Sequence, residues 1–351
     1  MLIPIHQQAE RFFLSRHGSS WVPGYLAERG FDRSTQSRWH IGYAPADWRA
    51  LTNHLRRLGF SDTAIESSGL ARRTSRGTLI DFFRDRAMFP IKDHDGTTIA
   101  FIGRSLDAEP RYLNSPQTPI YRKRQTLFGL HALTPSRPLV ITEGPLDAIA
   151  VTLAGREPLN GLALCGTALT ADHVPVLTRS HDLSHIVLAF DGDRAGRAAA
   201  TRSYPLFKGI CTAEAVTLPT GRDPAGILGE DGAEALAAIL TERAVPLADL
   251  VVDAAIHPWQ RSLDYAEGRI GALRSAGAAI AAMAPHDVAR QIARVAQRLG
   301  FDHPIVTEAV TECLASHLAD ADFPAPLTFG GPATRLKGRN PNERSPRGPT
   351  P

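Results

Sequence analysis

The chain has 351 residues, of which 43% are hydrophobic and 21% are charged, a composition typical of a soluble globular protein with room for two or three domains. No apolar run approaches the roughly 20 residues that a membrane-spanning helix needs, and the first residues lack the pattern of a secretory signal, so we expect a cytoplasmic protein with no membrane partner. The net charge of +3 is unevenly spread, because residues 1–135 hold 19 Lys and Arg against 12 Asp and Glu, whereas the rest of the chain holds 20 against 24. The excess is almost all arginine, which indicates either an anionic partner, such as a nucleic acid or nucleotide, or only a basic surface.

The cysteines are too few and too far apart to organise a site. Cys165, Cys211 and Cys313 form no CxxC pair, so neither a disulfide framework nor a four-ligand zinc site can be drawn from them. We therefore expect no zinc.

Two different hydrophobic patterns occur before residue 135. Apolar residues recur at intervals of three and four up to about residue 75, which predicts helices with short turns. From about residue 78 to residue 129 the pattern becomes strand-like, and residues 86–93 and 97–106 predict a hairpin joined by His94-Asp95-Gly96.

From residue 138 onward, predicted strands alternate with predicted helices. This alternation implies a parallel sheet covered by helices on both faces. From Ala233 the chain looks helical and alanine-rich, and residues 322–351, dominated by Pro, Gly, Arg and Asn, predict a disordered tail. The predicted strands of the parallel sheet are residues 138–142, 161–165, 185–190 and 213–218.

The Asp191-Gly192-Asp193 turn follows the third of these strands, and a helix-like segment begins directly after it at Arg194. Ligands bind at the carboxyl ends of strands in a parallel sheet, and two carboxylates placed two residues apart there can share a hard cation and its phosphate ligands. A plain polar turn is the alternative interpretation, since Asp-Gly is a common turn dipeptide.

Further carboxylates follow two other strands of the same sheet. Glu143 comes after the first strand and Asp223 lies in the loop after the fourth, so these side chains converge if the sheet is parallel. Gathered carboxylates repel one another unless a cation neutralises them, and Mg²⁺ suits such a site. Each has a simpler explanation: Glu143 as a helix cap, Asp147 as a charge favouring a helix N-terminus, and Asp223 as a turn residue before Pro224.

These segments resemble the Toprim domain of bacterial primases, topoisomerases and some nucleases, which carries Glu-Gly after its first strand and Asp-x-Asp after its third. The resemblance is closest to primases of the DnaG type. Residues 165–173 and 218–228 resemble loops of that domain, and the whole resemblance covers roughly residues 5–320. Three upstream segments are similar to the basic subdomain of primase catalytic cores, namely residues 25–45, 83–106 and 111–133.

The resemblance implies a mixed α+β and α/β architecture in four parts. These are a basic α+β N-terminal subdomain over residues 1–135, a Rossmann-like Toprim domain with a parallel sheet over 136–232, a small helical bundle over 233–321, and the tail over 322–351.

The same resemblance implies roles for individual residues. The expected ligands of Mg²⁺ or Mn²⁺ are Glu143, Asp191, Asp193 and Asp223, of which the first three are also the expected catalytic residues, with Gly144 and Asp147 in support. The residues expected to bind nucleotide and DNA are Arg86, Arg104, Arg111, Tyr112, Asn114 and Lys123.

The chain departs from the family pattern in three ways. Ala225 stands where a second aspartate is usual, which puts one metal ligand in doubt, and Arg111 stands where a lysine is usual. The Cys/His cluster of the family's N-terminal zinc ribbon is also missing from this sequence. We therefore expect a stand-alone primase core from a plasmid, phage or mobile element.

The expected activity is metal-dependent synthesis of short RNA primers from nucleoside triphosphates on a single-stranded DNA template. A replicative helicase or a separate zinc-ribbon protein are further candidate partners. Two alternatives stay open, a Toprim nuclease or topoisomerase and a non-catalytic protein that binds single-stranded DNA or a nucleotide.

Overall fold

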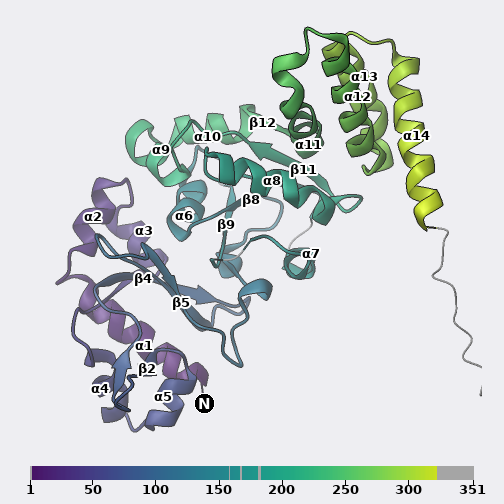
Figure 1. Ribbon diagram of the computed structural model, residues 1–351. Helices are drawn as coiled ribbons and strands as arrows, with labels where there is room; N and C mark the ends of the chain where they lie inside the picture. Colours follow the sequence, from purple (N-terminus) through teal and green to yellow (C-terminus); the bar gives the residue numbers. More distant parts are fainter. Residues whose placement is uncertain (1, 158, 167, 181–182, 322–351) are drawn as a thin grey trace, which may run out of the picture.

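The computed structural model describes residues 2–157, 159–166, 168–180 and 183–321, and the predicted tail lies outside these residues. Figure 1 shows an extended arrangement, with an antiparallel sheet at the N-terminal end, a second sheet in the middle, and helices α11–α14 at the far end. No helix in the described ranges is both long enough and apolar enough to cross a membrane.

The N-terminal part is built on a four-stranded antiparallel sheet of order β1-β4-β5-β6. These strands are β1 (Gly42–Ala44), β4 (Arg86–Lys92), β5 (Thr98–Arg104) and β6 (Tyr112–Asn114). A small hairpin lies beside them, formed by β2 (Ala71–Arg73) and β3 (Leu79–Asp81). The helices of this part are α1 (Leu2–His17), α2 (Val22–Glu28), α3 (Arg33–Arg38), α4 (Ala50–Arg57) and α5 (Asp62–Ser67).

Strands β4 and β5 form the predicted hairpin and are buried on both faces. On one face Phe101 packs edge-on against Phe13 of α1, with ring centroids 5.3 Å apart. On the other face Phe89 contacts Phe128, which stacks on Trp39. The antiparallel sheet is therefore the centre of the N-terminal part, with α1, α4 and α5 on one side and α2 and the second sheet on the other.

The second sheet has six strands in the order β12-β11-β10-β8-β9-β7. Its four central strands are parallel to one another, and each edge strand is antiparallel to its neighbour. The strands are β7 (Leu127–Phe128), β8 (Leu139–Thr142), β9 (Asn160–Leu164), β10 (His185–Leu188), β11 (Thr212–Val216) and β12 (Ala244–Pro246). The helices around it are α6 (Pro145–Leu153), α7 (Val174–Ser180), α8 (Arg194–Phe207), α9 (Pro224–Asp231) and α10 (Ala233–Glu242).

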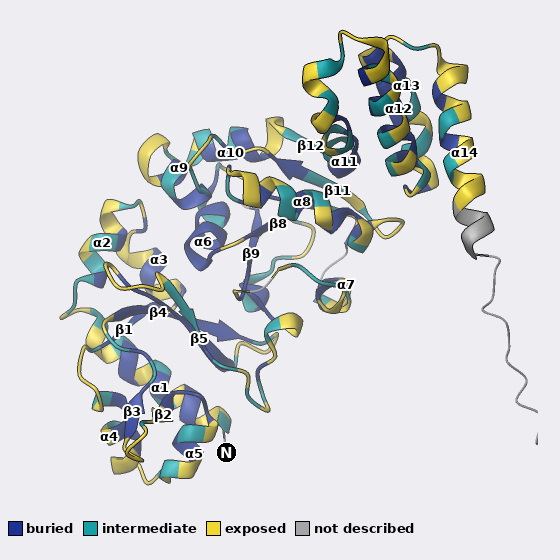
Figure 2. Ribbon diagram, viewed as in Figure 1, coloured by how far each residue is buried: buried dark blue, intermediate teal, exposed yellow. Residues whose placement is uncertain are grey.

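Helices cover both faces of this sheet, as the sequence predicted. Val140 and Val187 belong to the apolar cluster that includes residues of α6, α9 and α10, while Ile141 and Leu188 belong to the cluster that includes residues of α8 and α11. Figure 2 shows the central strands as buried. The mixed α/β fold class with a parallel sheet is confirmed.

The far end is helical, formed by α11 (Leu247–Ile256), α12 (Ala266–Ala281), α13 (Pro285–Leu299) and α14 (His303–Ala321). Helix α12 packs against α11, α13 and α14. Three arginines of α13 form ion pairs with Asp249 and Asp253 of α11, which ties those two helices together.

The strand assignments differ from the prediction in detail. The predicted strands 185–190 and 213–218 each end two residues early, at Leu188 and Val216. The three-residue strands β1 and β12 lie in regions that were predicted to be helical. Their extended conformation is set by pairing with strands elsewhere in the chain, because β1 pairs with β4 and β12 pairs with β11. Strand β7 precedes residue 135 yet pairs with β9, so the second sheet crosses the proposed boundary at 135/136. The subdivision of the chain stays a prediction.

Candidate functional site

A cavity of about 320 Å³ lies at the carboxyl ends of the parallel strands, where that sheet faces β5 and β6. Its walls combine carboxylates of the second sheet with basic and aromatic side chains of the N-terminal part, so we call it the central cavity. The side chains that line it include Arg29, Arg104, Arg111, Tyr112, Asn114, Glu143, Asp147, Asp191, Asp223 and Ala225.

Glu143 and Gly144 form the turn from β8 into α6. Gly144 is the N-cap of α6, and Pro145 occupies the first helical turn, where its missing N–H costs nothing. A Cβ on Gly144 would stand 2.7 Å from Oδ2 of Asp147, so a side chain here would displace that carboxylate. This turn leaves Glu143 exposed at the cavity wall.

The Asp191-Gly192-Asp193 turn lies beside Glu143. The backbone N–H of Asp191 donates to Oε1 of Glu143 at 3.2 Å, which joins the ends of β8 and β10. Asp193 is the N-cap of α8, because its Oδ1 accepts from the N–H of Gly196 at 2.7 Å. Arg197 holds the turn from the helix side by donating to the carbonyl of Gly192 at 3.0 Å. Asp193 does not line the central cavity, although it is near enough for its charge to affect Asp191.

The loop after β11 brings Asp223 to the same edge. Asp223 caps α9, its Oδ1 accepting from the N–H of Gly226 at 2.6 Å, and Arg29 stands 3.9 Å from that oxygen. The simpler interpretation of Asp223 as a capping turn residue is therefore also realised. Ala225, which stands at the family's second aspartate position, is buried and donates its N–H to Oδ1 of Asp147 at 3.1 Å.

The gathered carboxylates raise one another's proton affinity. Burial, followed by the charges of Glu143, Asp223 and Asp193, raises the pKa of Asp191 to about 6. Burial and the charge of Asp223 also raise the pKa of Asp147 well above the usual aspartate range. Ionised carboxylates at this edge are therefore under-compensated by the protein's own charges.

The donor set fits a hard divalent cation. In the described residues, no group of three His, Cys, Asp or Glu side chains is arranged to hold a metal ion as it stands. Mg²⁺ usually takes only one or two protein carboxylates and completes its shell with water and substrate phosphates. Glu143 and Asp191 are adjacent, and the caps formed by Asp193 and Asp223 are made through Oδ1, so carboxylate oxygens remain at this edge.

The opposite wall is cationic and aromatic. The guanidinium of Arg104 lies over the ring of Tyr25 at 4.5 Å and near that of Tyr112 at 5.8 Å. Trp21 packs edge-on against Tyr25, with centroids 5.6 Å apart, and extends this aromatic group beyond the cavity. Arginines beside partly exposed aromatic rings are typical of surfaces that bind phosphates and bases.

Two of the predicted nucleotide-binding residues lie outside the central cavity. Arg86 is buried, and its Nη1 donates to the carbonyls of Gly103, Pro110 and Arg111 at 2.9–3.2 Å. This guanidinium therefore braces the segment that carries Arg104 and Arg111. Lys123 is half-buried in a short 3₁₀ helix, and its carbonyl lies 3.3 Å from Nε2 of His173.

Arg29 and Tyr25 were not singled out from the sequence. Arg29 reaches the cavity because the turn after α2 packs against α9, where a Cβ on Gly229 would stand 3.1 Å from the carbonyl of Arg29. Such a contact between distant segments leaves no local pattern. The one local signal is the Arg29-Gly30 pair at the end of a predicted helix, with Gly30 at φ +86°.

The two parts of the chain that line the central cavity each match a known protein family. The model of the DNA primase catalytic core, N-terminal domain, matches residues 11–134, and the Toprim-like model matches residues 140–228. The RNA polymerase domain of Mycobacterium tuberculosis primase DnaG, solved in complex with double-stranded DNA, is 30% identical with a TM-score of 0.72, over 86% of this chain and 98% of that one. The chain belongs to the DnaG primase family.

Other members of the DnaG primase family show the same extent of similarity. The DNA primase of Streptomyces coelicolor is 33% identical over 99% of this chain, and the chain spans 58% of the length of that relative. The DnaG primase catalytic domain bound to single-stranded DNA is 28% identical with a TM-score of 0.72, covering 86% of this chain and 97% of that one. The recognised family and fold are therefore those expected from the Glu143-Gly144 and Asp191-Gly192-Asp193 motifs.

Proposed function

We propose that this chain is a metal-dependent nucleotidyltransferase that makes short RNA primers on single-stranded DNA. The observation that carries the proposal is the central cavity, in which the carboxylates of the parallel sheet face Arg29, Arg104 and Arg111 across one small space. Family membership supports it, since relatives in this family are DNA primases and one catalytic domain is solved with single-stranded DNA.

The carboxylates are the proposed cation ligands. Glu143 and Asp191 would hold Mg²⁺ or Mn²⁺, with Asp193 and Asp223 beside them and Gly144 and Asp147 supporting the turn. A bound divalent cation would neutralise charge developing on the phosphate oxygens. Because Ala225 supplies only a methyl group to the cavity wall, we propose that one carboxylate fewer is offered here than in the usual family pattern.

The arginines are the proposed phosphate ligands. Arg104 and Arg111 present guanidinium groups at the wall opposite the carboxylates, and such groups bind phosphate oxygens through paired hydrogen bonds. In the reaction, the oxygen of a 3′-hydroxyl forms a bond to the α-phosphorus of the incoming triphosphate, the bond to pyrophosphate breaks, and the hydroxyl proton is released. Tyr112 and Asn114 line the same wall and would position the nucleotide, and Trp21 and Tyr25 beside that wall would contact the template.

Labelled-nucleotide incorporation on single-stranded templates tests the proposal, with Mg²⁺ and Mn²⁺ compared. We expect the native chain to make short products and Asp191→Ala to lower the rate at least 100-fold, since it removes one of the two carboxylates proposed to hold the cation. Asp264→Ala is the matched control, because Asp264 is exposed on the helical end of the molecule and far along the chain from the cavity. Equal rates for the native chain and Asp191→Ala would overturn the proposal.

Further assays on the same proteins distinguish primer synthesis from the two alternative functions. Nicking of a supercoiled plasmid without primer synthesis would indicate a Toprim nuclease. Tight binding of single-stranded DNA with no primer synthesis, even after addition of a zinc-ribbon protein, would indicate a non-catalytic protein. A plasmid, phage or mobile-element origin and a helicase partner remain predictions from the sequence.

A further inference from the structure

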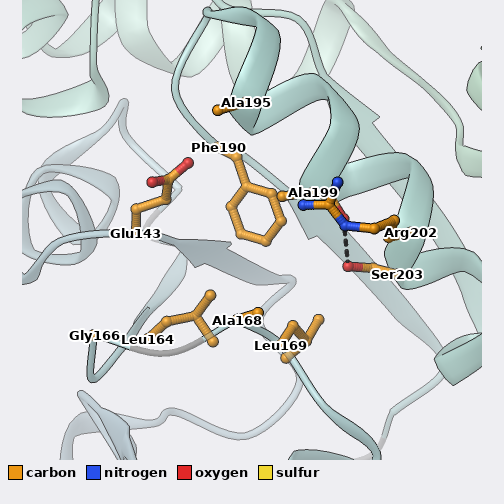
Figure 3. A pocket seen from close by; sticks show the side chains of 10 residues that line it. All are labelled: Glu143, Leu164, Gly166, Ala168, Leu169, Phe190, Ala195, Ala199, Arg202 and Ser203. Carbon is orange, nitrogen blue, oxygen red and sulfur yellow. Dashed lines mark hydrogen bonds between the residues drawn. The ribbon is translucent and has the colours of Figure 1, made fainter.

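A second cavity of about 390 Å³ adjoins the central cavity. Glu143, Leu164 and Gly166 line both of them, so Glu143 stands between the two spaces. Figure 3 shows the second cavity between the loop that follows β9 and the side of α8. We call it the α8 cavity.

The α8 cavity has an apolar floor and a cationic end. Phe190, Leu164 and Leu169 supply the floor, as Figure 3 shows. Along α8, Ala195 and Ala199 line the cavity one turn apart, and Arg202 follows one turn later on the same face. The two alanines leave room that longer side chains would fill.

Arg202 is available to a ligand. Its side chain is exposed, and in the described part of the chain it makes no hydrogen bond or ion pair with another residue. Ser203 beside it donates its hydroxyl to the carbonyl of Ala199 at 2.9 Å, so the hydroxyl proton is already used. An apolar floor with one free guanidinium at its end matches a nucleoside carrying a phosphate, because a base packs on apolar surface and arginine binds phosphate.

We propose that the α8 cavity binds the nucleotide that supplies the 3′-hydroxyl, which is the first nucleotide of a primer or its 3′-terminal nucleotide, with its base against the apolar floor and its 5′-phosphate at Arg202. This inference rests on the proposed primer synthesis, which joins two nucleotides at one set of carboxylates. The arginines of the central cavity suit the incoming triphosphate, and the second nucleotide must reach Glu143 from another side. The α8 cavity offers that approach, and its volume lies in the range of small-molecule sites.

Kinetics with the two nucleotides varied separately tests this assignment. On a template that specifies different first and second nucleotides, Ala199→Phe should raise the KM for the first nucleotide at least 10-fold and change that for the second less than 3-fold. Ala195→Phe, at a more exposed position of the same wall, is the second variant in case Ala199→Phe does not fold. Arg202→Ala should raise the KM for a 5′-phosphorylated first nucleotide and leave that for the corresponding nucleoside unchanged.

Two controls are matched to these variants. Ala198→Phe adds the same ring to α8 at a residue that does not line the cavity, and Arg261→Ala removes an exposed arginine from the helical end. Both should leave each KM unchanged. Unchanged KM for the first nucleotide in Ala199→Phe and Ala195→Phe, or an equal rise for both nucleotides, would overturn the inference.

A binding measurement separates failure of this inference from failure of the proposed function. We would titrate the chain with 2-aminopurine riboside 5′-monophosphate and follow quenching of the probe's fluorescence, which needs no catalysis. Binding that Ala199→Phe weakens at least 10-fold and Arg111→Ala leaves unchanged supports the α8 cavity. Binding that Arg111→Ala abolishes and Ala199→Phe preserves contradicts it, whether or not primers are made.

Discussion

Arg86, at the start of β4, and Arg111, just before β6, show that two arginines at one end of a sheet can serve different purposes. The buried guanidinium of Arg86 donates to the carbonyl of Gly103 in β5 and to those of Pro110 and Arg111 in the segment leading into β6. Arg111 lies at the end of that segment with an exposed side chain at the wall of the central cavity. We therefore expect Arg86 to position Arg111, and Arg111 to contact phosphate.

This difference predicts opposite effects for two substitutions. Arg86→Met should lower the free energy of unfolding by about 2–4 kcal/mol, because buried carbonyls lose their donor. Arg111→Ala should change it by about 0.5 kcal/mol or less while weakening the binding of the incoming nucleoside triphosphate at the central cavity roughly 10-fold. Urea denaturation and equilibrium nucleotide binding measure the two effects, and a stable Arg86→Met chain beside a destabilised Arg111→Ala chain would contradict the account.

At the scale of elements, the N-terminal helix is tied to the antiparallel sheet by one carboxylate. Glu10 of α1 receives hydrogen bonds from Lys92 of β4 at 3.0 Å and from Thr98 of β5, and it also contacts His40 at 2.6 Å. Burial by itself would raise the pKa of Glu10, but the hydrogen bonds from Thr98 and Lys92 and the charge of Lys92 outweigh it and lower that pKa.

A lowered carboxylate pKa stabilises the folded chain above the ordinary glutamate range, and this contribution is lost as the pH falls through the folded-state pKa. Glu10→Gln should therefore lower the free energy of unfolding by about 1–3 kcal/mol at pH 7, with a smaller difference below about pH 4. Thermal unfolding of both chains at pH 7 and pH 3.5 measures the difference. A difference that grows on acidification would show that Glu10 does not act through its charge.

At the scale of the whole molecule, one apolar cluster joins the two sheets. Leu26 and Phe31 near α2 belong to the same buried cluster as Ala148 of α6 and Ile227 of α9. Strand β7 adds to this continuity, since it comes from the N-terminal part and pairs with β9.

We therefore expect the N-terminal part and the second sheet to unfold together. Far-UV circular dichroism should give the same midpoint as tryptophan fluorescence in a Trp259→Phe background, in which the remaining tryptophans all precede residue 50. Leu26→Ala should lower both midpoints equally and cost about 2–4 kcal/mol. Two separated transitions would mean that the parts are independent.

Features that depend on a local sequence pattern could be predicted from the sequence, whereas features that depend on packing between distant segments could not. The parallel sheet, the Glu143-Gly144 turn and the Asp191-Gly192-Asp193 turn are each predictable, because an apolar strand followed by acidic or glycine residues is a local pattern. Arg29 enters the cavity only through contact with a helix about 200 residues away, so no local pattern marks it.

The α8 cavity is invisible in the sequence for a related reason. Ala199 and Phe190 are unremarkable residues, and only the placement of α8 against the loop after β9 makes them walls of a cavity. The buried position of Arg86 likewise depends on the path of residues 103–111, which the strand pattern alone does not specify.

The central claim is that the carboxylate edge and the arginine wall act as one site for joining nucleotides on a template. Its most direct test is the identity of the product made on a single-stranded DNA of defined sequence with Mg²⁺ or Mn²⁺. The account predicts short RNA that is complementary to the template, retains a 5′-triphosphate, and is made neither by Asp191→Ala nor by Glu143→Ala. Product that ignores the template sequence, or that both variants still make at the native rate, would contradict it.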